Sequence, residues 1–374
     1  MGAGALVVPV LLEGRLARSE QAVSERWAAL AVKRRASTLL GISFRPRQVE
    51  EFGLDASATL QRLLAYPFEI VRLAAYWDRI EKGTGAFDFG DLDWQVDAAD
   101  RAGKQIIVGV GAVKNFGYPE YFVPAHRLDG PLREGRLVTP AVHGRLLAGA
   151  VEFVSRVVER YRGRSSVVAW QLEHEAVDPL GVEHSWRLSA EFVRAEMDAL
   201  KRSDPSRPVI MNGFLPTSTP VRLSQWWRTR DQGDSLAVAS RMADIVGIDY
   251  YPRHALARLG SRTAYMDGAG TPWQRTLVDA RVQSLRRDGK SLMVCEGQGE
   301  PWEAVTAPPN PLQREMFSCR PEHLVSNYNS AIMWSTAASP LYAYLFWGAE
   351  YWVLRDGAGD SRYLRALERI LELS

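Results

Sequence analysis

Two glutamates stand at the ends of apolar runs and could together break a glycosidic bond. Glu175 follows the run SVVAWQLE at 166–173, and Glu296 ends the run SLMVCE at 291–296. Glycoside cleavage needs one carboxylic acid to protonate the leaving oxygen and one carboxylate opposite the anomeric carbon. Two carboxyl groups about 5–5.5 Å apart suit a covalent, retaining mechanism. The fold must therefore bring together two residues that are far apart in the sequence.

Eight short apolar runs alternate with helical patterns and would position these glutamates. The runs are apolar on both faces, which is typical of parallel strands covered by helices. Eight such units favour an α/β fold of the (β/α)8 TIM barrel type. The alternative, a doubly wound open sheet, usually carries a G-x-G-x-x-G turn, which is absent here. The runs span 39–44, 68–76, 105–111, 166–173, 208–214, 244–251, 291–296 and 341–347.

The helical patterns divide the chain into an extension and one catalytic domain. Residues 17–35 form an amphipathic pattern of mixed charge, which predicts one extra N-terminal helix within an extension over 1–36. The barrel itself is expected over 37–374, and Asp55 is the predicted N-cap of its first helix. Helices are expected at 55–65, 91–102, 141–161, 185–202, 235–242, 271–287, 321–335 and 361–373.

The catalytic face of such a barrel lies at the carboxyl ends of its strands. Aromatic side chains gather at these predicted ends, and indole or phenol rings can pack on the apolar faces of sugars. The candidate substrate-binding residues at or just beyond strand ends are Trp77, His174, Tyr250, Tyr251, Gln298, Trp302 and Trp347, with Arg72 inside the second strand.

Four segments in a fixed order resemble those of clan A glycoside hydrolases, the retaining (β/α)8 glycosidases that include β-galactosidase-like and cellulase-like members. They are RLAAYWDRIE at 72–81, WQLEHE at 170–175, CEGQGEPW at 295–302 and WGAEYW at 347–352. The resemblance covers residues 37–374. It implies a retaining glycosidase that acts on a β-linked oligosaccharide or glycoside by double displacement.

The resemblance assigns roles to individual residues. Glu296 matches the nucleophile, and Glu175 matches the general acid/base. Arg72 and Tyr251 match positions that orient the nucleophile, with Tyr250 as the alternative if the strand register differs by one. Because burial and a nearby carboxylate raise the pKa of a carboxyl group, Glu175 is expected to be protonated when the reaction begins.

His174 departs from the family pattern, which usually has Asn before the acid/base. An Asn amide contacts the sugar 2-hydroxyl, whereas a histidine donates from a different point and carries a pH-dependent charge. A His-Glu pair also occurs in β-mannanase-like members, which favours an axial 2-hydroxyl. The alternative is a catalytically inactive barrel that only binds carbohydrate.

Other acidic residues near the predicted mouth receive secondary roles. Glu173 is expected to hold a partner such as Arg72. Glu300 could contact a sugar subsite, and Glu350 could reach the pocket rim. Asp78 and Glu81 lie in the second βα loop, where they would bind hydroxyl groups or face solvent.

Metal and cofactor chemistry is not predicted. His174-Glu175 lacks a second histidine at the spacing of zinc proteases. Two cysteines, Cys295 and Cys319, cannot build a disulfide framework or a four-ligand zinc site.

Composition and charge argue against nucleic acid and membrane partners, and the resemblance implies a carbohydrate substrate. Of the 374 residues, 46% are hydrophobic and 24% are charged, and the net charge of +2 offers no broad positive field for nucleic acid or an anionic membrane. The apolar run at 5–12 is too short to span a bilayer and has no preceding Lys or Arg, so a cytoplasmic location is expected. Homo-oligomerisation stays open.

Overall fold

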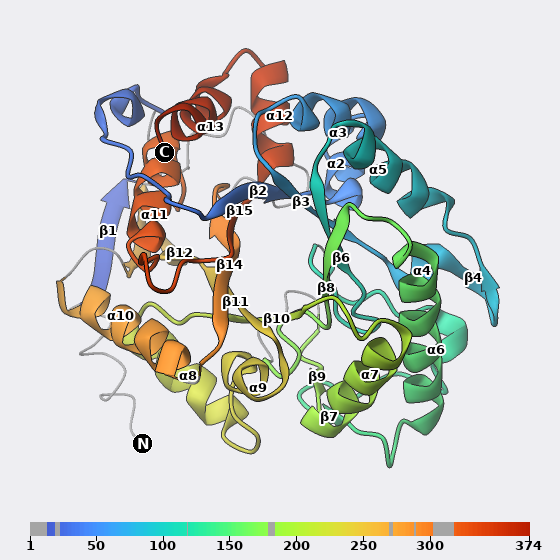
Figure 1. Cartoon of the computed structure of the whole chain (residues 1–374). Helices are drawn as coiled ribbons and strands as arrows, with labels where there is room; N and C mark the ends of the chain where they lie inside the picture. The colour runs from blue at the N-terminus through green and yellow to red at the C-terminus, as the bar shows by residue number, and fades with distance from the viewer. Residues whose placement is uncertain are drawn as a thin grey trace.

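Eight parallel strands form a closed barrel, and this confirms the predicted (β/α)8 fold (Figure 1). Each strand pairs with the next along the chain, and the last pairs with the first. Every predicted apolar run overlaps one of them, and β14 extends two residues beyond its run. The barrel strands are β2 (Leu39–Ser43), β3 (Ile70–Ala74), β6 (Gln105–Gly109), β8 (Val167–Gln171), β10 (Val209–Phe214), β11 (Ile245–Tyr250), β14 (Ser291–Gln298) and β15 (Ala343–Trp347).

The computed structural model describes residues 13–18, 23–117, 119–178, 184–268, 272–287, 289–301 and 318–374. Helices surround the barrel, and every predicted helix of the 37–374 region has a counterpart (Figure 1). The helices are α2 (Pro46–Glu51), α3 (Ala56–Leu64), α4 (Trp77–Ile80), α5 (Gly90–Arg101), α6 (Gly144–Tyr161), α7 (Ala190–Ser203), α8 (Thr219–Thr229), α9 (Ser235–Met242), α10 (Pro272–Arg287), α11 (Pro321–Ile332), α12 (Ala349–Gly357) and α13 (Arg362–Leu373).

Local capping explains where two of these helices begin. The Asp55 carboxylate accepts a hydrogen bond of 2.7 Å from the Ala58 amide, as predicted, and so satisfies a free donor at the start of α3. Helix α7 begins at Ala190 rather than 185. The two residues before its Ser189 cap instead form β9 (Arg187–Leu188), which pairs with β7 (Leu137–Val138).

The barrel interior changes from apolar to polar along its axis. Its apolar part is a cluster of inward-facing side chains that includes Ile70, Ile107, Ala169, Ile210 and Ile245. Two residues later, three of the same strands present Arg72, Gln171 and Asn212, all buried. Because successive strand residues alternate between faces, these polar groups lie in the next inward layer toward the carboxyl ends. The fold therefore places a buried polar layer directly beneath the predicted catalytic face.

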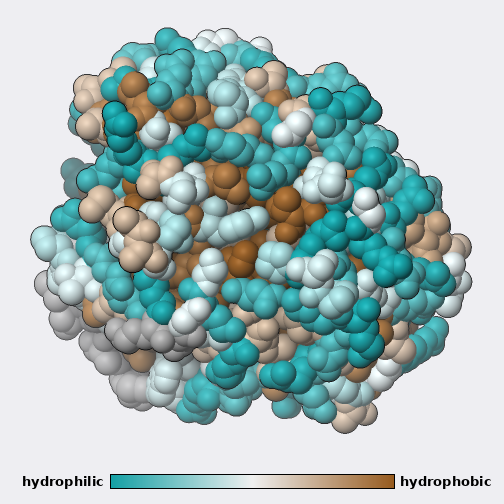
Figure 2. Space-filling view, in the orientation of Figure 1, coloured by the Kyte–Doolittle hydropathy of each residue, from teal (hydrophilic) through white to brown (hydrophobic). Residues whose placement is uncertain are grey.

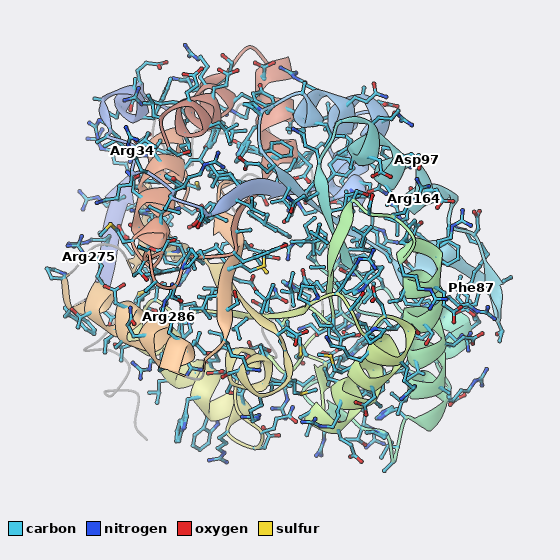
Figure 3. The ribbon with its side chains drawn as sticks, viewed as in Figure 1. Arg34, Phe87, Asp97, Arg164, Arg275 and Arg286 are labelled. Atoms are coloured by element: carbon cyan, nitrogen blue, oxygen red, sulfur yellow. The ribbon has the colours of Figure 1, made fainter. Side chains whose placement is uncertain are left out.

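The outer surface carries the charged side chains. In the orientation of Figure 1, hydrophobic residues gather at the centre over the barrel, and hydrophilic residues dominate the surrounding helices (Figure 2). Asp97 and Arg164 point outward at the edge of the molecule (Figure 3) and form an ion pair of 2.8 Å. Such exposed pairs contribute little to stability, so the barrel and its helical cover hold the fold.

The predicted N-terminal helix over 17–35 is wrong. Gly14–Arg18 form β1, which pairs with β13 (Arg262–Asp267), and only the short 3-10 helix η1 (Arg26–Ala29) follows among the described residues. β13 also pairs with β12 (Arg253–Leu259), so the extension completes a small antiparallel sheet beside the barrel. The amphipathic pattern was misleading because pairing with a hairpin distant in sequence outweighs local helix propensity.

The loops contain further short strands and a short 3-10 helix. β4 (Glu81–Gly83) and β5 (Ala86–Phe87) make a hairpin after the second barrel strand, and η2 (Ala125–Arg127) follows the third. Both cysteines are buried and unbonded to each other. Across the described ranges, no helix combines the length and apolarity needed to cross a membrane.

Candidate active site

Arg72 links the polar layer to Glu296. Its guanidinium donates to the Ser43 hydroxyl (2.9 Å), the Gln171 side-chain oxygen (2.9 Å) and the Glu296 carboxylate (2.8 Å). The ring of Phe116 lies 4.0 Å from the guanidinium carbon. With three partners and a stacked ring, a buried arginine has a fixed direction, and its charge is aimed at Glu296.

Glu296 reaches the mouth because β14 is irregular. Cys295 faces the barrel interior, so regular alternation would turn Glu296 outward. The register with β11 shifts here, so that Ile248 pairs with Val294 but Asp249 pairs with Glu296. This bulge inserts one extra residue and turns the carboxylate inward, a common use of bulges beside active sites.

The environment of Glu296 favours the ionised form. Besides Arg72, the Tyr251 hydroxyl donates a hydrogen bond of 2.6 Å to its carboxylate. Burial raises the pKa of Glu296, but the charge of Arg72 and the hydrogen bonds from Tyr251 and Arg72 oppose burial and lower it, and His174 adds to this effect only in its protonated form. An ionised, oriented carboxylate is what a nucleophile requires.

Glu175 lies in the loop after β8 and has the opposite electrostatic character. Burial raises its pKa well above the usual value, and the negative charges of Asp178, Glu120 and Glu296 add to this effect against the opposing Lys114. Its backbone φ of +42° is a strained conformation for a residue with a side chain. The surrounding structure must therefore hold this loop in place.

Lys114 provides that restraint from the neighbouring loop. Its ammonium group donates to the backbone oxygens of Glu175 (2.8 Å) and Asp178 (3.2 Å). The Glu173 carboxylate in turn accepts from the backbone amides of Val113 and Lys114 at 2.9 and 2.6 Å. Glu173 thus ties two loops together, and the prediction that it holds Arg72 is wrong.

Asn212 connects His174 and Asp249 by hydrogen bonds. The Asn212 amide donates to His174 Nδ1 at 2.8 Å and to Asp249 Oδ2 at 2.6 Å, and Gln171 fixes its orientation by donating to its oxygen at 3.0 Å. Burial lowers the pKa of His174 to about 4, so the imidazole is neutral near pH 7. Because Nδ1 accepts the amide proton, the ring proton of His174 lies on Nε2.

The two glutamates are neighbours of the same two side chains. His174 Nδ1 lies 3.6 Å from the Glu296 carboxylate. One donor atom from each of His174, Glu175 and Asp249 lies within 4.8 Å of the other two. This grouping is explained by hydrogen bonding, since the Asn212 amide already occupies His174 Nδ1 and Asp249 Oδ2, and we assign no metal to it. Glu175 and Glu296 therefore belong to one cluster of buried polar side chains at the carboxyl ends of the strands.

An aromatic cluster lines this end of the barrel. It contains Trp347, at the end of β15, together with Tyr76, Phe116, Phe122, Phe214 and Tyr251. The Arg45 guanidinium lies 4.2 Å from the Trp347 ring centroid and is held by Glu300 and Glu350 at 2.9 and 2.7 Å. Glu300 and Glu350 were expected at a sugar subsite and at the pocket rim. They are instead fully buried partners of Arg45, and they hold its guanidinium against the Trp347 ring.

Three predicted pocket residues lie elsewhere. Trp77 is fully buried in the outer core, where it stacks on Phe153 and donates to Glu81. Tyr250 points outward and packs against Trp334, because alternation along β11 turns only Tyr251 inward. The prediction that Trp77 and Tyr250 contact the sugar is therefore wrong.

Gln298 is the third residue that lies away from the cluster around Glu175 and Glu296. Its side chain pairs with both backbone groups of Arg253 and so anchors the start of β12. In the second βα loop, Asp78 pairs with Arg47 through Oδ2 and Glu81 pairs with Arg127, so both carboxylates are engaged in ion pairs. Trp302 lies outside the described residues.

Sequence reasoning missed Asn212 and Asp249. Both are single polar residues within runs that otherwise read as apolar, 208–214 and 244–251. Each is one or two residues before the end of its strand and faces inward, at the layer of Arg72 and Gln171. A polar residue near the carboxyl end of a barrel strand was the signal that would have found them.

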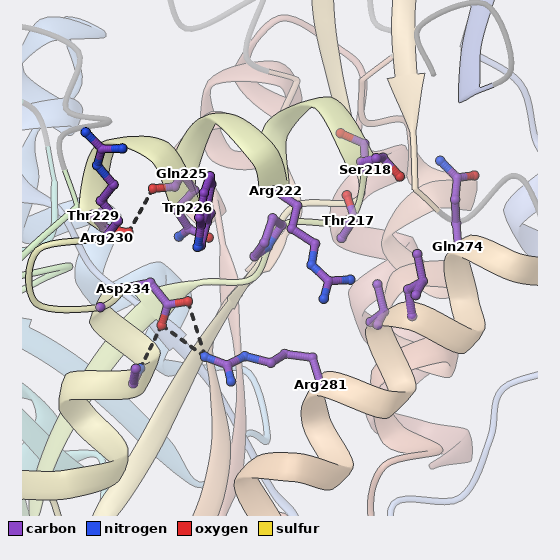
Figure 4. A pocket seen from close by; sticks show the side chains of 16 residues that line it. Thr217, Ser218, Arg222, Gln225, Trp226, Thr229, Arg230, Asp234, Gln274 and Arg281 are labelled. Carbon is purple, nitrogen blue, oxygen red and sulfur yellow. Dashed lines mark hydrogen bonds and ion pairs between the residues drawn. The ribbon is translucent and has the colours of Figure 1, made fainter. Parts of the chain in front are cut away.

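A second pocket of about 330 Å³ lies outside the barrel, between α8, α9 and α10 (Figure 4). Asp234 is the only carboxylate among its lining residues, and Arg281 pairs with it at 3.0 Å. The Asp234 side chain also caps α9. This pocket therefore lacks the pair of carboxyl groups that glycoside cleavage needs, and the barrel mouth is the candidate active site.

No protein-family model matches the sequence. No curated protein matches it either. Solved structures do. A glycoside hydrolase, GH5_18, from Streptomyces cattleya in complex with Manβ1-4GlcNAc aligns with a TM-score of 0.55 and 14% identity, covering 83% of this chain and 71% of that one.

Two larger proteins align similarly. A β-galactosidase from Bacillus circulans sp. alkalophilus gives a TM-score of 0.54 and 12% identity over 92% of this chain and 56% of that one. An exo-β-1,4-mannosidase from Opitutaceae bacterium strain TAV5 gives a TM-score of 0.53 and 16% identity. This alignment covers 85% of this chain and 54% of that one. These likenesses, at 12–16% identity, confirm the (β/α)8 barrel fold that was predicted from the sequence.

Proposed function

We propose that the protein is a retaining β-glycosidase in which Glu296 is the nucleophile and Glu175 is the general acid/base. The observation that carries this proposal is the contrast between the surroundings of two carboxyl groups that belong to one buried polar cluster. Arg72 and Tyr251 favour ionisation of Glu296. Burial and negative neighbours keep the proton on Glu175. Opposed pKa shifts in a pair of carboxyl groups distinguish the acid from the nucleophile.

The reaction would proceed in two steps. Glu175 gives its proton to the glycosidic oxygen while the Glu296 carboxylate bonds to the anomeric carbon and the leaving alcohol departs. The Glu175 carboxylate then removes a proton from a water molecule, whose oxygen attacks the anomeric carbon and releases Glu296. Each group ends in its starting protonation state, and the sugar keeps its anomeric configuration.

The pH dependence follows from the two shifts. The active form has Glu296 ionised and Glu175 protonated. Activity should therefore rise as the pH increases through the lowered pKa of Glu296 and fall as it passes the raised pKa of Glu175. We expect a bell-shaped profile of kcat/KM.

We propose β-mannosides as the first substrates to test. Two of the similar structures are described by a mannosidase activity or a mannose-containing ligand. The neutral His174 offers a donor on Nε2 where an amide is usual, and this difference favours an altered contact to the 2-hydroxyl. A short β-linked oligosaccharide or glycoside is the proposed substrate class.

A panel of aryl β-glycosides (mannoside, glucoside, galactoside, xyloside and fucoside) tests the activity. With the best substrate sugar, a 2-deoxy-2-fluoro inactivator should attach to Glu296, as read by peptide mass mapping. Glu296→Gln is the matched control and should remain unlabelled. Sugar binding without turnover or labelling would instead support the alternative, an inactive carbohydrate-binding barrel, which only the departure at His174 favours.

A further inference from the structure

Asp249 is a third buried carboxyl group in the candidate active site, and the mechanism above does not use it. It lies near the end of β11 with no exposed surface. Its Oδ2 accepts the Asn212 amide at 2.6 Å. Its Oδ1 has no hydrogen-bond partner among the described residues. A buried oxygen without a donor is costly, so a proton on a neighbouring group would stabilise it.

Glu175 is the group that can supply this proton. A carboxyl oxygen of Glu175 lies within 4.8 Å of one from Asp249, and the negative charge of Glu175 contributes to the raised pKa of Asp249. Two carboxyl groups hydrogen-bond to each other only if one carries a proton, because an ionised carboxylate is solely an acceptor. The pair resembles other enzyme sites in which two carboxyl groups share one proton, since like charges at this distance resist joint ionisation.

We propose that Asp249 is the proton-sharing partner of Glu175, so that the two carboxyl groups hold one proton between them in the free enzyme. This inference deepens the proposed function and rests on it. Asp249 is a positioning residue, since it acts through Glu175 and not on the sugar.

The pairing would serve both steps of the reaction. In the first, the shared proton leaves Glu175 for the glycosidic oxygen, and both carboxyl groups become anions. Their repulsion makes Glu175 a stronger base for the second step, in which it takes a proton from water and restores the shared state. No proton beyond those of the substrate, the water and the pair is required.

The surrounding charges fit this assignment. Glu175 faces Asp178, Glu120, Glu296 and the cation of Lys114. Asp249 faces Glu296 and Arg72, and the neutral His174 adjoins both carboxyl groups. Arg72 is engaged with Glu296, Gln171 and Ser43, and the ammonium group of Lys114 with backbone oxygens. Burial raises the pKa of both Glu175 and Asp249.

Infrared difference spectroscopy tests the shared proton without any substrate. The carbonyl stretch of a protonated carboxylic acid should be present in the wild-type protein at pH 7. Asp249→Asn keeps the shape, can accept from Asn212 and can donate to Glu175, so Glu175 should ionise and the band of one carboxylic acid should disappear. Glu175→Gln should remove the same band, because its amide donates to Asp249.

The double variant decides the question. One shared proton predicts that Asp249→Asn with Glu175→Gln loses no more intensity than either single variant. A band that keeps its full wild-type intensity in Asp249→Asn, or a double variant that loses twice the intensity of either single variant, would overturn the proposal. Glu196→Gln is the control, because Glu196 pairs with Glu173 in a separate buried acid pair, and any intensity that it removes should add to the loss in Asp249→Asn.

Kinetics provide the second measurement. With the best aryl glycoside from the panel, Asp249→Asn should move the basic limb of the kcat/KM profile down by at least about one pH unit, because an amide stabilises ionised Glu175. A merely structural role would reduce the rate at every pH and leave the limb in place. If no glycoside is hydrolysed, the proposed function fails, whereas the infrared result still reports on the pair.

Discussion

The two sides of the barrel mouth shift the pKa of a glutamate in opposite directions. On the side of β14, Glu296 receives hydrogen bonds from Arg72 and Tyr251. On the side of β8, Glu175 has a carboxyl neighbour, Asp249, and its nearest cation is turned to backbone oxygens. Under the proposed function, the same side chain serves as an ionised nucleophile in one place and as a protonated acid in the other. The difference teaches that the partners, and not the residue type, assign the chemical role.

Removal of the proposed nucleophile tests this contrast most severely. Glu296→Gln should reduce kcat by about 10⁶, the order of loss found when a covalent nucleophile is removed from other enzymes. Steady-state hydrolysis of the best aryl glycoside measures it, with circular dichroism as the control for folding. A loss below about tenfold would show that Glu296 does not attack the sugar.

Removal of the proposed acid should depend on the leaving group. Glu175→Gln should cost roughly 10²–10⁴ in kcat/KM for poor leaving groups, the usual value of a positioned acid, and much less for activated phenols. A series of aryl glycosides with phenols of different acidity measures the difference. Equal losses across that series would contradict the assignment of Glu175 as the acid.

Arg72→Met should shift the acid limb of the pH profile. Arg72 stabilises the charged form of Glu296, so its removal raises the pKa of Glu296 and moves the acid limb of kcat/KM to higher pH by about 1–3 units. Activity should thus fall more at pH 5 than at pH 7. Ser43→Ala removes one bond of Arg72 but no charge, and its limb should stay close to that of the wild type.

Adjacent tyrosines offer the finest comparison. Tyr251→Phe removes one hydrogen bond to ionised Glu296 and should raise the acid limb by about one unit. Tyr250→Phe removes a hydroxyl group on the opposite face of the strand, so we expect activity within about twofold of wild type and a loss of about 1 kcal/mol in unfolding free energy. Kinetic profiles and thermal unfolding measure both. Reversed effects would place the strand in the other register.

The strands and helices of the barrel were predictable because their sequence signals are local. The eight strands are apolar on both faces, and Asp55 caps its helix through a contact three residues away. Glu175 and Glu296 stand at strand ends in the sequence itself. The N-terminal extension was predicted incorrectly, because β1 pairs with a hairpin more than 240 residues later in the chain.

The sequence by itself determined the barrel, the order of its strands and the positions of the two glutamates along them. Only the tertiary structure decided that the bulge after Val294 turns Glu296 inward, that Tyr251 and not Tyr250 faces it, and that Asp249 lies beside Glu175. Periodicity reports which residues are apolar, whereas pKa values and the direction of a side chain depend on neighbours supplied by other strands. Those neighbours meet only when the sheet closes.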